Sequence, residues 1–169
     1  MTLGGALLLT GCSSLVSLNP FVTDKEAQTD SALIGTWGSD DGDTIYIIRP
    51  GGAEYKITYI DKSSTSIKFE ARLWRAGSAE LLDLVSKSED AFQVPVHTIM
   101  RVWPKPTTLE MAVLDTDWLK KLATEKLATQ VVDTRTLITS PGDAVRAFLM
   151  INGADDRAYD KKELLQRIP

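Results

Sequence analysis

Short alternating segments fill the sequence from residue 33 to residue 114, and this repetition constrains the fold more than any other feature. Apolar side chains at Tyr55, Ile57 and Tyr59, for example, alternate with polar neighbours. A period of two places successive side chains on opposite faces of a β-strand. We therefore expect seven strands, each with one apolar face, at residues 33–38, 44–49, 54–61, 66–75, 79–86, 96–103 and 108–114.

Turn residues separate these segments. Asp41-Gly42 and Gly51-Gly52 tolerate positive φ, and four prolines lie at strand margins, where a missing N–H costs no ladder hydrogen bond. Sequential hairpins with one solvent-exposed face and one apolar face indicate an antiparallel meander that curls around an apolar core. The prolines are Pro50, Pro95, Pro104 and Pro106.

The hydrophobic period changes after the seventh strand. Asp115 is expected to cap a helix, residues 131–139 to form an eighth strand, and Ser140-Pro141 to begin a second helix. Leu164, Leu165 and Ile168 have helical spacing, so a last helix is expected after Asp160. The predicted fold class is mainly β: an antiparallel meander barrel of about eight strands, with C-terminal helices.

The chain's single cysteine, Cys12, directly follows its most apolar run. A single thiol cannot form an internal disulfide. The small residues Thr10 and Gly11 before it fit the substrate cleft of a signal peptidase. Residues 9–12, Leu-Thr-Gly-Cys, resemble the lipobox of bacterial lipoproteins. The resemblance implies that Cys12 is acylated by fatty acids such as palmitate after cleavage before it. An N-terminal strand or helix with a buried free cysteine is the alternative.

This resemblance divides the chain into a signal peptide at 1–11, a lipidated flexible tether at 12–31 and one domain at 32–169. A signal peptide begins with basic residues and residues 1–5 have none, so we expect the true start to lie upstream. Ser13 and Ser14 stand where an inner-membrane retention signal has aspartate, which favours the outer membrane, facing the periplasm. The expected partner is therefore a membrane, bound through the lipid.

Gly35-Thr36-Trp37 opens the first strand and resembles the glycine–x–tryptophan motif of lipocalin and calycin barrels. The resemblance implies an eight-strand barrel in which Trp37 closes one end against an arginine, for which Arg101 and Arg135 are candidates. A β-sandwich or partly open sheet, with Trp37 as an ordinary core residue, is the alternative.

The sequence predicts no catalytic site, metal site or cofactor. His97 is the only histidine, and without a serine–glycine nucleophile motif we expect it to be structural. Asp40, Asp41 and Asp43 lack the spacing of a calcium loop and are expected at a hairpin tip. Trp74 and Trp103 are expected to plug a barrel end or to pack under the helices, with a shared barrel mouth that binds a partner as the alternative. The net charge of −4 argues against nucleic acid as a partner.

Two functions follow from these expectations. In the first, the barrel binds a small apolar ligand, since eight strands enclose just enough space for one. In the second, a solid domain is presented on the tether to another envelope protein, and no ligand is involved. The expected ligand-binding residues are Tyr55, Ile57, Phe69, Leu73, Met100 and Met111.

Overall fold

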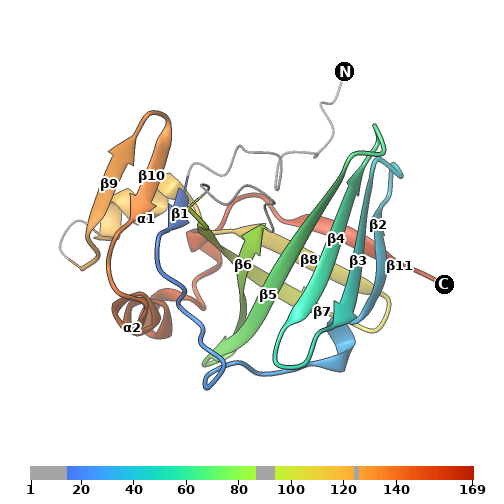
Figure 1. Cartoon of the computed structure of the whole chain (residues 1–169), viewed down its shortest axis with the longest axis horizontal. Helices are drawn as coiled ribbons and strands as arrows, with labels where there is room; N and C mark the ends of the chain where they lie inside the picture. Colours follow the sequence, from blue (N-terminus) through green and yellow to red (C-terminus); the bar gives the residue numbers. More distant parts are fainter. Residues whose placement is uncertain (1–14, 87–93, 124–125) are drawn as a thin grey trace.

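Eight antiparallel strands form a closed barrel in the computed structural model, which describes residues 15–86, 94–123 and 126–169 (Figure 1). Strands β2 to β8 pair in sequence order, and β11 then pairs with both β8 and β2. This last strand closes the barrel, so that its eight strands have no free edge among themselves. The barrel strands are β2 (Gly35–Ser39), β3 (Thr44–Pro50), β4 (Tyr55–Asp61), β5 (Ser66–Ala76), β6 (Ala79–Ser86), β7 (His97–Pro104), β8 (Thr108–Val113) and β11 (Glu163–Ile168).

The predicted fold class is confirmed, and the first seven predicted strands correspond to β2 through β8. Both of the first two predicted helices are present, as α1 (Thr116–Ala123) and α2 (Gly142–Asn152). Asp115 caps α1 as expected, because its carboxylate accepts a hydrogen bond from the Trp118 N–H. Local periodicity therefore identified these elements correctly.

The predictions for the eighth strand and the last helix were wrong. Residues 131–139 contribute to a hairpin outside the barrel, formed by β9 (Thr129–Val132) and β10 (Arg135–Ile138). The eighth barrel strand is β11, where a helix was expected. The spacing of Leu164, Leu165 and Ile168 also fits a strand in which Leu165 points inward, and pairing with β2 and β8 decides between the two.

Alternation along the barrel strands separates an inner apolar cluster from the outer wall. On β6, for example, Leu82 and Leu84 face inward while Leu81 faces outward. Aromatic side chains make up much of the inner cluster, and Tyr46 lies 5.2 Å from Tyr59 between ring centroids. The largest fully buried side chains of this cluster are Trp37, Tyr46, Tyr55, Tyr59, Leu33, Ile48, Leu73, Leu82, Met100 and Leu109.

A second apolar cluster lies on the outer wall of the barrel. The insertion between β8 and β11, which contains α1, β9, β10, α2 and the short 3-10 helix η2 (Asp156–Ala158), covers one side of the barrel (Figure 1). Trp74 and Leu81 of the wall pack there with Val145, Phe148 and Leu149 of α2. The described chain thus has two apolar clusters separated by one layer of sheet.

Residues 15–22, which we call the strap, pack against this outer wall. Strand β1 (Leu15–Ser17) pairs in parallel with β10 and touches β7 through Ser17. Phe21 and Val22 are fully buried. The flexible tether expected at 12–31 is therefore wrong for the strap, because burying these apolar side chains fixes the backbone to the barrel.

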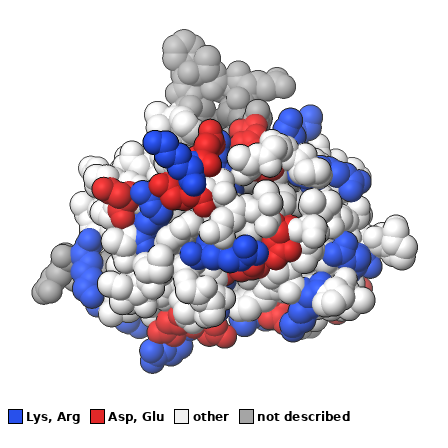
Figure 2. Space-filling model, turned by 90° about the horizontal axis from the view of Figure 1, so that it is seen from below, with Lys and Arg blue, Asp and Glu red and all other residues white. Residues whose placement is uncertain are grey.

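The barrel has two distinct ends. The η1 end carries the 3-10 helix η1 (Ser31–Leu33) and the turns after β3, β5 and β7, whereas the insertion end carries the turns after β2 and β4 and the start of the insertion. Seen from below Figure 1, basic and acidic side chains are interspersed over the surface (Figure 2). Such mixing leaves that face without an extended field of one sign.

Candidate functional site

The six residues expected to bind an apolar ligand all belong to the inner cluster of the barrel. Leu73 is fully buried, and even Phe69, the most accessible of the six, exposes only 8% of its surface. Side chains this buried pack against one another and not against solvent-filled space. The six residues therefore share the barrel interior, where they form part of a packed core, and their binding of a ligand stays a prediction.

The tryptophan of the Gly35-Thr36-Trp37 motif closes the η1 end. Trp37 is fully buried, and its indole N–H donates to the Leu33 carbonyl at 3.0 Å. The Arg167 guanidinium lies over the indole ring, 4.1 Å from its centroid. Gly35 leaves room for this arginine, since a Cβ there would lie 2.6 Å from Arg167 Nη1.

Arg167 is thus the arginine that meets Trp37, and the expectation of Arg101 or Arg135 was wrong. Arg101 lies on the outer wall, where it contacts the Trp103 ring and bonds Asp156 at 2.9 Å. Arg167 belongs to β11, which was taken for a helix, so its position beside Trp37 was not foreseen. Its guanidinium also donates to the carbonyls of Ala32, Ile34 and Pro106.

Polar side chains gather inside the insertion end. The Tyr46 hydroxyl donates to Glu163 Oε2 at 3.0 Å. Burial is the main reason that the pKa of Glu163 rises to about 7, and the nearby Asp41 charge adds to it. The buried Tyr59 hydroxyl has no well-placed hydrogen-bonding partner within the described residues, although Thr44 is near enough to lower its pKa slightly against the effect of burial.

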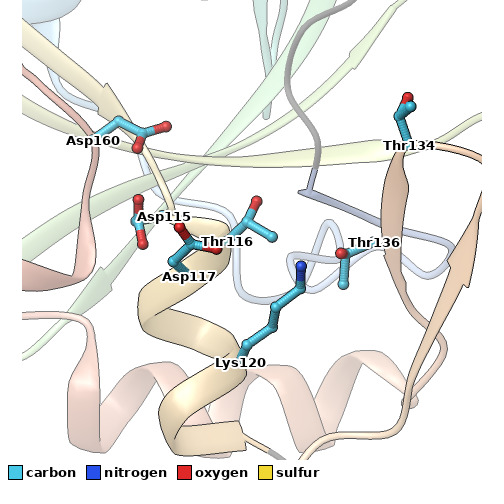
Figure 3. A pocket seen from close by; sticks show the side chains of 7 residues that line it. All are labelled: Asp115, Thr116, Asp117, Lys120, Thr134, Thr136 and Asp160. Atoms are coloured by element: carbon cyan, nitrogen blue, oxygen red, sulfur yellow. The ribbon is translucent and has the colours of Figure 1, made fainter.

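A polar pocket of about 310 Å³ lies outside the barrel, between α1 and the β9–β10 hairpin (Figure 3). Hydrogen bonds from Asp115 N to Ala158 O and from Asp160 N to Val113 O hold the chain after η2 against the end of β8. This pairing brings Asp115 and Asp160 together on one side of the pocket. The lining residues are Asp115, Thr116, Asp117, Lys120, Thr134, Thr136 and Asp160.

The carboxylates of the pocket interact. Burial, together with a hydrogen bond and charge repulsion from Asp115, raises the pKa of Asp160 to about 6. The side chain of Lys120 extends from α1 toward Thr136 on the opposite side (Figure 3). The pocket therefore combines carboxyl, amine and hydroxyl side chains, which can hydrogen-bond a small polar molecule.

Sequence reasoning missed this pocket, because its residues come from three segments that only the folded insertion brings together. Asp115 was recognised only as a helix cap and Asp160 only as the start of a helix that the structure does not contain, and Thr136 carried no signal. Within the described residues, no group of three or more His, Cys, Asp or Glu side chains could hold a metal ion.

His97 and Asp83 form a buried pair on the outer wall. Their Nδ1 and Oδ1 atoms are 2.6 Å apart, and Asp83 Oδ2 accepts the backbone N–H groups of Phe21 and Val22 at 2.8 and 3.1 Å. The pair therefore holds the strap, which agrees with a structural role for His97. Asp83 was missed, although a carboxylate within the apolar run Leu81 to Val85 is an available signal.

The remaining candidates lie at scattered positions. Trp74 belongs to the outer cluster that α2 covers and Trp103 packs on it, so the expected packing under the helices is confirmed and the alternative of a shared barrel mouth is wrong. Asp41 accepts hydrogen bonds from Ser39 and Asp43 within the β2–β3 turn, at a hairpin tip as expected. Cys12 lies outside the described residues.

Comparison with known proteins adds no assignment, since no family model, curated protein or solved structure matches the chain. Among the described residues, no helix combines the length and the apolar character needed to cross a bilayer. Function must therefore be argued from the residues themselves.

Proposed function

We propose that the chain is a lipid-anchored protein of the bacterial cell envelope that presents a solid barrel domain to another envelope component. The anchor would be Cys12, acylated within its lipobox-like sequence, and the outer membrane facing the periplasm is the expected location. Fatty acyl chains contribute about 0.8 kcal/mol per buried CH₂, so several chains on one cysteine give lasting attachment.

The observation that carries the proposed interaction role is the filling of the barrel interior. Tyr46, Tyr55 and Tyr59 occupy space that a ligand-binding barrel would leave for its ligand, and each is almost completely buried. Binding an acyl chain would require several of these side chains to move and lose their contacts. This favours the interaction role over the apolar-ligand role.

Fatty-acid binding provides the first test. We expect the purified wild-type domain to show no saturable binding of a fluorescent fatty acid. Leu73→Ala and Met100→Ala serve as matched controls, because removing a fully buried side chain leaves a cavity that small apolar molecules enter. Saturable, stoichiometric binding by the wild type would instead support the apolar-ligand role.

Purification from gently solubilised membranes provides the second test. Native mass spectrometry of this material should show a stoichiometric protein partner, whereas a retained lipid in addition to the anchor would favour the ligand role.

Cys12→Ser tests the anchor: we expect the variant to remain uncut and unacylated. A normally processed Cys12→Ser protein would contradict the lipoprotein assignment.

A further inference from the structure

The strap is fixed to the domain from both sides. Asp83 binds the N–H groups of Phe21 and Val22 from the barrel wall. On the other side, Arg146 of α2 donates to the Phe21 carbonyl at 2.8 Å. Gly142, at the start of α2, lies so close to the strap that a Cβ there would be 2.0 Å from the Pro20 carbonyl oxygen. The strap therefore behaves as part of the domain.

Only a short piece of chain separates the strap from the proposed anchor. Cys12 and Leu15 are three residues apart in the sequence, and three residues of extended chain span at most ~11 Å. The acyl chains of a lipidated cysteine occupy the hydrocarbon region, which keeps its backbone at the headgroup level. Leu15 would then lie within about the same ~11 Å of the bilayer surface.

The β9–β10 hairpin is the part of the domain beside Leu15. Leu15 pairs with Thr136, and the hairpin turn at residues 133–134 comes directly before β10, two residues before Thr136. The β9–β10 hairpin lies beside β1 in Figure 1. Val131 and Val132 are exposed on β9, with exposed fractions of 64% and 44%, and Arg135 is also exposed. Apolar side chains with a neighbouring cation suit the headgroup region of a bilayer.

We propose that the strap holds the barrel on the bilayer with the β9–β10 hairpin against the lipid headgroups and the η1 end away from them. This orientation rests on the proposed acylation of Cys12. The mixed charges seen from below Figure 1 lie on the face away from the bilayer in this arrangement (Figure 2). A partner protein would therefore meet the η1 end or the outer side of the barrel, and not the hairpin.

The test uses the full-length lipidated protein in vesicles of phosphatidylethanolamine and phosphatidylglycerol. Acylation occupies the thiol of Cys12, so Thr134→Cys and Ser78→Cys each introduce the only free thiol. Both positions are exposed, and Ser78 lies in the β5–β6 turn at the η1 end. After labelling with a fluorophore, we expect spin-labelled lipids to quench position 134 several-fold more strongly than position 78. Equal quenching, or stronger quenching at 78, would overturn the orientation.

A linker variant tests the role of the short connection. Glycine–serine residues inserted between Ser14 and Leu15 leave the sequence of the strap unchanged, and Phe21 and Val22 keep their hydrogen bonds to Asp83, so we expect the domain to stay folded. Quenching at position 134 should fall as the insert lengthens, and unchanged quenching would contradict the proposal. Intact-mass measurement distinguishes failure of the proposed anchor from failure of the proposed orientation. An unmodified Cys12 would contradict the anchor. An acylated Cys12 with equal quenching at both positions would contradict only the orientation.

Discussion

The η1 end and the insertion end of the barrel each place an ionisable side chain of β11 beside the apolar interior. Arg167 at the η1 end meets three backbone carbonyls and the face of Trp37. Glu163 at the insertion end accepts a hydrogen bond from one neutral donor, Tyr46, and forms no ion pair with any residue that the structure describes. Burial raises its pKa. The comparison indicates that the η1 end is built for stability, while the insertion end retains polar groups that are only partly satisfied.

Removing the Trp37 indole at the η1 end should have the largest effect on the stability of the fold. Trp37→Ala deletes a fully buried indole and leaves Arg167 without its aromatic contact. We expect a loss of about 3–5 kcal/mol in the free energy of unfolding, measured by urea denaturation. Trp103→Ala, at a partly buried site on the outer wall, is the matched control and should cost clearly less. Equal losses of stability in the two variants would show that Trp37 at the η1 end stabilises the fold no more than a partly buried tryptophan on the outer wall.

Arg167→Ala should have the next largest effect. The variant loses the hydrogen bonds to the three carbonyls and the contact with Trp37, for an expected cost of about 2 kcal/mol. Arg167→Lys keeps the charge but lacks the planar fork, so it should recover only part of this loss. Full recovery by lysine in the same denaturation experiment would show that charge alone matters at this end.

Glu163→Gln tests the insertion end through pH. Because the folded pKa is about 7 and the ordinary value is 4.5, the native state binds more protons than the unfolded state between these values. Wild-type stability should therefore fall as pH rises from 4.5 to 7, by about 1–2 kcal/mol after allowance for partial exposure. Glutamine cannot ionise, so the variant should lose this contribution. An identical pH profile for the two proteins would show that Glu163 is not strained by burial.

The smallest expected effect comes from Tyr59→Phe. Removing a buried hydroxyl with no well-placed partner among the described residues should raise the free energy of unfolding by less than about 1 kcal/mol, because no hydrogen bond is lost. Tyr46→Phe is the matched control, because it removes the only described donor to Glu163 and should destabilise the fold. A large loss in Tyr59→Phe would show that this hydroxyl is in fact satisfied.

The residues of β2 and of β11 at the barrel ends differ in how far the sequence predicted them. Trp37 and Gly35 were identified because their motif is local and lies in a strand with clear alternation. Arg167 and Glu163 were missed, since β11 has a spacing that fits a helix or a strand equally well and only pairing with β2 decides between them. Seven barrel strands follow from patterns within a few residues, but the eighth depends on contacts between distant parts of the chain.

The candidate sites show the same division. The six predicted interior residues follow from alternation and were correctly grouped, although the sequence could not show how tightly they pack. The polar pocket and the hydrogen bonds from the strap to Asp83 each join segments that are far apart in sequence. Their positions follow from the folded insertion and strap, for which a single sequence supplies no pairing information.

The pairing of β11 with β2 also has a kinetic consequence. Leu165 pairs with Ser39 across almost the whole described chain, whereas the meander from β2 to β8 pairs only nearest neighbours in sequence. Contacts between near neighbours lose less loop entropy and tend to form early, so barrel closure should be the slow, late step of folding. Until that step, β2 and β8 each have a free edge, and the newly made chain is then most exposed to aggregation and to capture by chaperones.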